Sequence, residues 1–150
     1  MRAVCQRAQS ASVTVDGEVV GSFAGEGLVI LLGVSVTDTA AVAEQVARKV
    51  AGLRMLDGER SLTDAGAPAL VVSQFTLYGD VRKGRRPSWT RSAKGEQAQP
   101  LYERFMAELE SSGVRVERGV FGAMMDVSLT NSGPFTLIVD SDELAGPRHG

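Results

Sequence analysis

The sequence predicts an α/β protein of the α+β kind, in which antiparallel strands are combined with two helices. Three observations lead to this prediction. Residues 2–34 form β-rich runs with short links, which favours antiparallel pairing over β–α–β units. Two later segments carry apolar residues at the spacing of an amphipathic helix. The chain has 150 residues, 43% hydrophobic and 23% charged, so we expect a single domain with a buried core over residues 1–150.

The opening part of the chain is predicted to form strands joined by glycine-containing turns. Asp16-Gly17 is a strong two-residue hairpin signal, because the favoured hairpin turns need positive φ at their central positions. Gly25-Glu26-Gly27 is expected to turn the chain again, into a continuous apolar run that is typical of a central strand. The strands expected here are 2–8, 11–15, 18–22 and 28–34.

Two helices are expected after these strands. The first begins at an N-cap on Asp38 and continues to about Ala51. The second covers residues 96–112, with Pro100 in its first turn and Gly113 at its end. Each has one apolar face for the core: Val42, Val46, Val50 and Leu53 on the first, and Tyr102, Phe105, Met106 and Leu109 on the second.

The remaining segments are shorter. Residues 53–56 are interpreted as a short strand, and residues 57–68, with two glycines and a proline, as a loop. After the second helix we expect strands at 114–117, 124–129 and 135–140, the last two joined by a loop at 130–134. The polar tail over residues 142–150 is expected to fray.

The stretch VVSQFTLYGD, Val71 to Asp80, is the first candidate for a functional site. A buried apolar run leads into Ser73, Gln74 and Thr76 around Phe75. Uncharged polar groups at a strand end are suited to orienting a small substrate. The alternative is an ordinary strand, with Phe75 and Leu77 facing inward and the polar residues outward. Both interpretations stay open from this stretch alone.

A basic segment lies on an otherwise acidic chain. Six of the sixteen Lys and Arg residues lie between Arg82 and Lys94 with no acid among them, and the other ten face eighteen acids. This pattern indicates that a polyanion is bound at one place. Trp89 within the segment favours a role with nucleic acid, because aromatic and guanidinium planes can stack on bases. The alternative is a solvated charged loop that Trp89 fastens to the core.

Several common catalytic designs are excluded. The only histidine, His149, lies next to the last residue, which argues against Ser-His-Asp and Cys-His arrangements. No clusters of residues have the spacing of metal ligands, and no glycines match a Walker or dinucleotide fingerprint, so we expect no metal and no cofactor. The single cysteine, Cys5, is interpreted as a small buried residue and fits a reducing cytosol.

No membrane segment is expected either. The longest apolar run, near residues 28–32, is far shorter than the roughly 18 residues of a spanning helix, and the N-terminus lacks the apolar stretch of a signal peptide. The chemistry that remains needs little help from ionisable side chains. Cleavage of an ester is one example, because backbone N–H groups can supply an oxyanion pocket while a water or a substrate hydroxyl attacks.

Four segments together resemble the D-aminoacyl-tRNA deacylase (DTD) family. They are SQFTLYGD at 73–80, KGRRPSW at 83–89, LYERF at 101–105 and NSGPFT at 131–136. The first hairpin is similar to that family as well, and the match is collinear over essentially the whole chain. The resemblance implies antiparallel, β-barrel-like sheets flanked by two helices, and a cytoplasmic homodimer. It also implies hydrolysis of the ester that joins a D-amino acid to the 3′-terminal adenosine of tRNA.

The resemblance also assigns roles to residues. Ser73, Gln74, Phe75 and Thr76 would form the catalytic pocket, with Thr76 expected to act through its side chain, as nucleophile or by orienting water. Because the sequence offers no base to activate this hydroxyl, we favour backbone N–H groups near Phe75 and Thr76 as the oxyanion donors and the tRNA 2′-OH assisting attack; both versions stay open. Gly133-Pro134, joined by a cis peptide bond, would reach into the partner subunit's site and exclude L-aminoacyl groups, whereas glycyl-tRNA mischarged on tRNA(Ala) would be cleaved. The other implied contacts are Arg7 bracing this loop, Phe121, Met124 and Met125 walling the adenine, and Arg82, Lys83, Arg85, Arg86 and Trp89 holding the acceptor stem.

Two other functions stay open beside the deacylase. The first is a non-catalytic tRNA- or RNA-binding module, in which the basic segment is functional and SQFTL is an ordinary strand. The second is a small-molecule-binding or structural dimer with a merely solvated basic loop. Turnover of an aminoacyl-tRNA separates the first from a deacylase, and salt-sensitive affinity for tRNA separates the second, because phosphate contacts weaken as salt rises.

Overall fold

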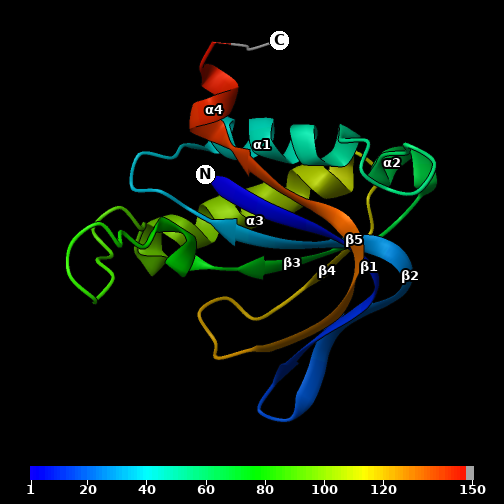
Figure 1. Ribbon diagram of the computed structural model, residues 1–150, viewed down its shortest axis with the longest axis horizontal. Helices are drawn as coiled ribbons and strands as arrows, with labels where there is room; N and C mark the ends of the chain where they lie inside the picture. Colours follow the sequence, from blue (N-terminus) through cyan, green and yellow to red (C-terminus); the bar gives the residue numbers. More distant parts are fainter. Residues whose placement is uncertain (148–150) are drawn as a thin grey trace.

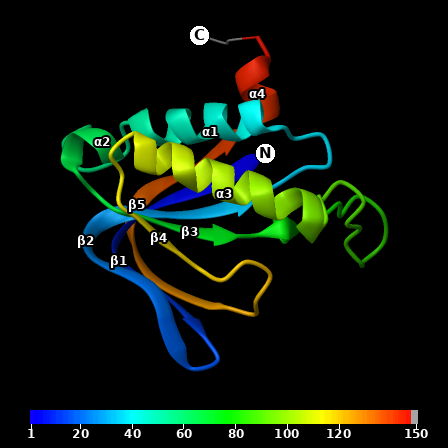
Figure 2. The ribbon, with the colours of Figure 1, turned by 180° about the vertical axis from the view of Figure 1, so that it is seen from behind.

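The structure, a computed structural model, describes residues 1–147 and consists of one mixed sheet and its helices (Figure 1). The predicted mixed α/β fold is confirmed, and its two long helices lie together over one face of the sheet (Figure 2). The strands are β1 (Arg2–Val15), β2 (Glu18–Gly33), β3 (Ala69–Ser73), β4 (Val116–Arg118) and β5 (Asp126–Asp140). The helices are α1 (Ala40–Gly52), α2 (Leu62–Ala65), α3 (Gly95–Ser111), α4 (Ser141–Ala145) and the 3₁₀ helix η1 (Phe75–Tyr78).

The strand order is β4-β3-β2-β1-β5, and the sheet is strongly curved without closing into a barrel. The expected antiparallel pairing holds for β1 with β2 and for β1 with β5. It is wrong for β2 with β3 and for β3 with β4, which are parallel. Parallel neighbours need a long crossover connection, and the segments that contain α1 and α3 provide the two crossovers.

The first two strands are longer than predicted. The Asp16-Gly17 hairpin turn is confirmed, with φ of 50° and 80° at its two residues. The expected turn at 25–27 is wrong, because β2 continues through it and absorbs the irregularity as a register shift opposite residues 8–10 of β1. β5 likewise replaces two predicted strands. Its residues 132–135 form a bulge between the pairs Ala8↔Asn131 and Gln6↔Thr136.

The helix ends differ from the predictions for local reasons. The N-cap of α1 is Thr39, whose hydroxyl accepts from the Val42 N–H. Asp38 instead accepts from the Met1 ammonium at 2.6 Å and from the Ser35 N–H at 2.7 Å. Pro100 lies in the second turn of α3, which begins one residue earlier than expected. Gly113 does end this helix, with φ of 86°.

The segments between the long elements also depart from expectation. Residues 53–56 form only an isolated bridge, Leu56 with Arg60, in place of a strand. The predicted loop over 57–68 contains α2, whose Ser61 and Asp64 form a capping box. In the tail, residues 141–145 form α4, while 148–150, with His149, lie outside the described residues. Over residues 1–147 there is no helix long and apolar enough to cross a membrane.

The core lies between the sheet and the pair α1 and α3. The predicted face of α3 is confirmed, since Tyr102, Phe105, Met106 and Leu109 are all buried. Val46 and Val50 of α1 meet them, while Val42 and Leu53 are only partly buried. The opposite face of the sheet has a smaller apolar cluster around Val13, Phe23 and Leu70. The helix pair thus fixes β3, whose carboxyl end leads into η1.

Cys5 lies at the centre of this core on β1, fully buried, as the sequence predicted. Burial raises the pKa of its thiol to about 12, so thiolate is almost absent at pH 8. We expect iodoacetamide at pH 8 to leave the native chain unmodified and to label one thiol per chain in guanidinium chloride, as measured by intact mass. Labelling of the native chain at the rate of free cysteine would contradict this burial.

Candidate active site

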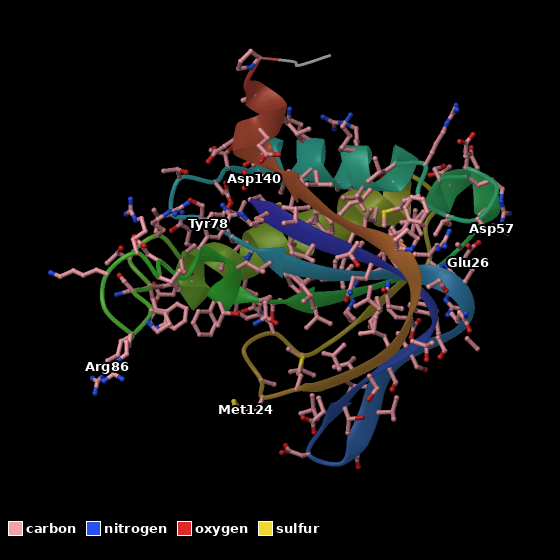
Figure 3. All side chains as sticks on the ribbon, in the orientation of Figure 1. Glu26, Asp57, Tyr78, Arg86, Met124 and Asp140 are labelled. Atoms are coloured by element: carbon pink, nitrogen blue, oxygen red, sulfur yellow. The ribbon has the colours of Figure 1, made fainter. Side chains whose placement is uncertain are left out.

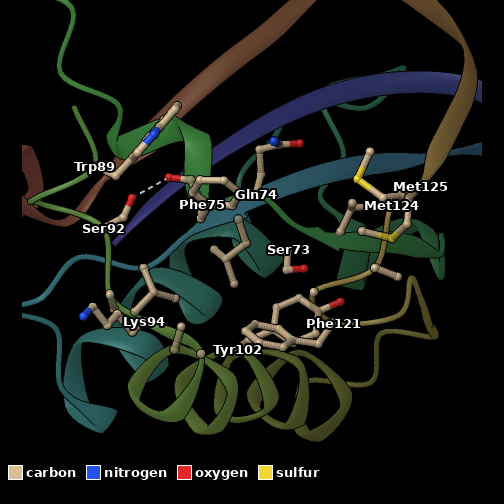
Figure 4. A pocket seen from close by; sticks show the side chains of 18 of the residues that line it. Ser73, Gln74, Phe75, Trp89, Ser92, Lys94, Tyr102, Phe121, Met124 and Met125 are labelled. Carbon is tan, nitrogen blue, oxygen red and sulfur yellow. Dashed lines mark hydrogen bonds between the residues drawn. The ribbon is translucent and has the colours of Figure 1, made fainter. Parts of the chain in front are cut away.

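A cavity of about 630 Å³ opens where β3 ends. Five segments line it (Figure 4): the strand end with Ser73, Gln74 and Phe75, the first turns of α3, the loop that leads into β5, the end of β2, and the segment from Trp89 to Lys94. Tyr102 lies at its base, where its hydroxyl donates to the Val71 carbonyl at 2.8 Å. The cavity therefore lies at the carboxyl end of β3, where backbone groups leave the sheet and turn toward bound molecules.

The strand-end residues form a turn and not a continuing strand. The inward-facing strand interpretation is wrong, because Phe75 is 57% exposed and begins the 3₁₀ helix η1. The first N–H groups of such a helix have no partner within it. Within the described chain the N–H groups of Phe75 and Thr76 donate no hydrogen bond to other segments. Two neighbouring N–H groups therefore have no acceptor in the described chain, and the first of them belongs to Phe75, which lines the cavity.

Thr76 is placed differently from Ser73, Gln74 and Phe75, which line the cavity. Its side chain is exposed, does not line the cavity, and accepts from the Gln74 side-chain amide. No acidic or basic side chain hydrogen-bonds to its hydroxyl, so nothing in the described structure activates it as a nucleophile. The backbone N–H of Thr76 has no acceptor in another described segment and directly follows Phe75, which lines the cavity.

Phe121, Met124 and Met125 form the opposite wall of the cavity. The Phe121 ring lies against Tyr102, with centroids 5.7 Å apart and planes tilted by 46°. Met124 is 93% exposed at the mouth, whereas the Met125 sulfur packs against Gly119, where a Cβ would lie only 2.6 Å from it. A wall with a flat aromatic ring and polarisable thioethers suits contact with an aromatic ring.

The basic loop, residues 82–94, lies beside this cavity and is held to η1. Trp89 packs edge-on against Phe75 with ring centroids 5.2 Å apart, and it fits there because Gly79 has no side chain. The Ser92 hydroxyl donates to the Phe75 carbonyl at 2.6 Å. Sequence reasoning missed Ser92, because a serine in an irregular segment carries no signal of the carbonyl that it will meet.

The charges of the basic loop are presented to solvent. Arg82 is paired with Asp80 at 2.6 Å, and this hydrogen-bonded pair lowers the pKa of the Asp80 carboxyl to about 2. Lys83, Arg85 and Arg86 are exposed, and Arg86 points away from the body of the molecule (Figure 3). The predicted cationic residues therefore form an open surface next to the cavity.

Gly133 and Pro134 do not line this cavity. Their peptide bond is cis, as the resemblance implied, and both residues are exposed on the bulge of β5. Arg7 braces the bulge as expected: its side chain donates to the Ser132 carbonyl at 3.1 Å and to the Gly133 carbonyl at 3.4 Å. The guanidinium also lies 4.6 Å from the centroid of the Phe135 ring. The bulge is thus rigidly held at a distance from its own chain's cavity.

No group of three His, Cys, Asp or Glu residues that could hold a metal ion is found among residues 1–147. Tyr102 is the main ionisable group at the base of the cavity, and burial raises its pKa, so its hydroxyl stays protonated and continues to donate to Val71. Apart from Lys94, the described residues that line this cavity have no charged side chain, so its other donors are main-chain N–H groups and neutral side chains.

The chain matches the family model described as D-Tyr-tRNA(Tyr) deacylase over residues 4–140. It is similar to D-aminoacyl-tRNA deacylase of Micrococcus luteus, with 92% identity over 100% of both chains. It is similar also to D-aminoacyl-tRNA deacylase of Kocuria rhizophila, with 57% identity over 100% of both chains. The Thermus aquaticus D-aminoacyl-tRNA deacylase is 58% identical over 99% of this chain and 100% of the relative.

Two solved structures share the fold. The structure described as c-Myc DNA Unwinding Element Binding Protein has a TM-score of 0.86 at 37% identity and covers 93% of this chain and 98% of its own. The structure described as a probable eukaryotic D-amino acid tRNA deacylase has a TM-score of 0.80 at 19% identity, with coverage of 92% and 97%. The second likeness concerns the fold alone.

Proposed function

The chain belongs to the D-Tyr-tRNA(Tyr) deacylase family and hydrolyses D-aminoacyl-tRNA, and we propose that it does so with main-chain groups, as a homodimer in the cytoplasm. The observation that carries this mechanism is the pair of free N–H groups, on Phe75 and Thr76, at the edge of the cavity that begins at Ser73. Two such donors can stabilise the oxyanion that forms when an ester carbonyl is attacked.

The attacking group is supplied from outside the protein. Within the described chain no acidic or basic side chain hydrogen-bonds to the Thr76 hydroxyl, so a water molecule attacks with assistance from the 2′-OH of the terminal ribose. The protein orients the ester, shields it from bulk water with apolar side chains and stabilises the developing negative charge. These effects together can account for a large part of a rate enhancement. Ser73 and Gln74 orient the aminoacyl end in this arrangement, and Phe121, Met124 and Met125 enclose the adenine.

The selection against L-aminoacyl groups comes from a second subunit. The carbonyls of Gly133 and Pro134 accept hydrogen bonds from the substrate's α-amino group and occupy the space that an L side chain needs. The rigid brace by Arg7 and the exposure of this bulge, remote from its own cavity, support its use in the partner's site. A D side chain points away from the bulge, so its identity matters little.

The acceptor stem is held by the basic loop beside the cavity. Arg82, Lys83, Arg85 and Arg86 meet phosphates, and Trp89 offers a plane for stacking. The hydrogen bond from Arg82 lowers the pKa of Asp80 to about 2, so the pair of Arg82 with Asp80 is ionised at neutral pH and stays so in mild acid. The contribution of the phosphate contacts to the affinity for tRNA weakens as the salt concentration rises.

The test of the function is the hydrolysis of D-tyrosyl-tRNA by purified protein with a chelator present. Turnover well above the spontaneous rate, unchanged by the chelator, is the expected result. Binding of the tRNA without turnover of any D-aminoacyl ester would favour the RNA-binding module instead. Absence of both turnover and salt-sensitive binding would favour the small-molecule-binding or structural dimer.

Thr76 separates two versions of the mechanism. We expect Thr76→Ala to lower the single-turnover rate constant by about tenfold, because the backbone N–H remains while the hydroxyl bond to Gln74 is lost. Thr76→Ser, which keeps the hydroxyl, is the matched control and should stay within about twofold of the wild type. A loss of more than roughly a thousandfold in the alanine variant, absent in the serine variant, would assign the nucleophile to the side chain.

A further inference from the structure

One buried polar contact beside the active site is not explained by binding of the substrate. The Ser92 hydroxyl is directed at the Phe75 carbonyl at 2.6 Å, and the residue is only 9% exposed (Figure 4). Ser92 belongs to the far end of the basic loop, whereas Phe75 begins η1. The bond therefore joins two segments that are 17 residues apart in the sequence.

Ser92 itself is held firmly by its backbone. Its N–H donates to the Trp89 carbonyl at 3.0 Å, and it forms an isolated antiparallel bridge with Ser35. The flanking residues extend this pairing, since the Ala93 N–H donates to Val34 at 2.9 Å and the Val36 N–H to Arg91 at 3.1 Å. A hydroxyl on such a fixed backbone has few alternatives to the Phe75 carbonyl.

The peptide that Ser92 contacts carries one of the two oxyanion donors. The Phe75 carbonyl and the Thr76 N–H are the two ends of a single planar unit, so fixing the direction of one fixes the other. A hydrogen bond to the carbonyl also polarises the unit and strengthens its N–H as a donor. Within the described chain that N–H has no acceptor in another segment.

We propose that Ser92 is a positioning residue for the hydrolysis: it orients and polarises the Phe75–Thr76 peptide so that the Thr76 N–H faces the reacting carbonyl. This inference rests on the proposed function, since it needs an oxyanion at this N–H. It also makes the basic loop, through Ser92, a direct support of the catalytic turn. Acceptor-stem binding and ester cleavage are then joined by one side chain.

The experiment compares single-turnover hydrolysis of D-tyrosyl-tRNA with the affinity for uncharged tRNA. Ser92→Ala should lower the rate constant by about tenfold or more, because removal of a donor that acts at the oxyanion itself costs roughly a hundredfold to a thousandfold. Its tRNA affinity should stay within about twofold of the wild type. Ser92→Thr, which keeps the hydroxyl, should restore most of the rate.

Two further variants keep the outcome decisive. Ser112→Ala is the matched control: it removes another serine hydroxyl that donates to a main-chain carbonyl, that of Glu108 at 3.1 Å, at the opposite end of α3. It should leave the rate unchanged. Ser92→Cys keeps nearly the same volume with a much weaker donor, and it should lose rate as the alanine variant does even if the latter unfolds.

Three results distinguish the outcomes. A rate for Ser92→Ala or Ser92→Cys within about twofold of the wild type would overturn the inference. Parallel losses of rate and tRNA affinity would overturn it as well, since they would mean that Ser92 only holds the basic loop in place. Failure of the wild-type protein to cleave D-tyrosyl-tRNA is a different result, and it would refute the proposed function.

Discussion

D-tyrosyl-tRNA is expected to be hydrolysed at least about a thousandfold faster than L-tyrosyl-tRNA by the same protein. The proposed reason is the bulge at Gly133 and Pro134, two exposed residues next to the Ser132 and Gly133 carbonyls that accept hydrogen bonds from Arg7. In the proposed arrangement an L side chain would meet the partner's bulge, and the α-amino group would then lose its acceptors. A site built around hydrogen bonds rejects such an analogue by four orders of magnitude in favourable cases. The measurement is kcat/KM for each ester under identical conditions.

Glycyl-tRNA and L-alanyl-tRNA provide the control, because they differ by one methyl group. Glycine has no side chain to exclude, so glycyl-tRNA carried on tRNA(Ala) should be cleaved while L-alanyl-tRNA on the same tRNA is spared. Equal cleavage of the D- and L-tyrosyl esters would keep the hydrolase and reject exclusion by the bulge. Complete inertness of both the glycyl and L-alanyl esters would show that selection does not depend on the space of the side chain alone.

Ile138→Lys is expected to convert the proposed dimer into folded monomers and to lower kcat/KM at least about a hundredfold. β5 is an edge strand whose Phe135, Leu137 and Ile138 are 36%, 38% and 61% exposed, and such an edge invites pairing with another chain. A lysine buried without a partner in that interface costs several kcal/mol. Monomers would lack the partner's Gly133-Pro134 bulge. Light scattering after size-exclusion chromatography gives the mass, and D-tyrosyl-tRNA hydrolysis gives the activity.

Val19→Lys is the matched control for this substitution. Val19 is also 61% exposed but lies near the tip of the β1–β2 hairpin. We expect this variant to stay dimeric and active, and both variants to keep the far-ultraviolet circular dichroism of the wild type. A monomeric Ile138→Lys protein with full activity would disprove the site shared between subunits. An unchanged dimer would instead remove β5 from the interface.

The parts of the fold that sequence could predict are those governed by local patterns. The Asp16-Gly17 turn followed from the φ angles that a hairpin needs, and the buried face of α3 followed from its period. The path of β2 through Gly25 did not follow, because a glycine suits a bulge as well as a turn and only pairing with β1 decides. The parallel pairing of β3 was hidden for a similar reason, since it depends on where α1 and α3 pack.

The candidate site, too, could be predicted from the sequence only in part. The polar residues after β3 were found because a strand end with Ser73 and Gln74 is visible in sequence, and they do line the cavity. Thr76 was placed with them, yet its side chain turns to Gln74, since the change from strand to 3₁₀ helix rotates it away. Ser92 was not found at all, because its contact joins segments whose approach is set by tertiary packing.

The free N–H groups at the start of η1 have a consequence for genetics and for inhibitor chemistry. A substitution changes a side chain and leaves the peptide donor in place, and only proline removes it. A saturation scan of this protein will therefore find its inactivating alleles among residues that shape the backbone around Phe75, rather than among conventional acids, bases and nucleophiles. We expect an electrophilic warhead to find no activated hydroxyl at Thr76, since no acidic or basic side chain of the described chain hydrogen-bonds to it. We expect an effective inhibitor to carry a stable hydrogen-bond acceptor, such as a phosphonate, that mimics the negative charge of the oxyanion formed during ester hydrolysis.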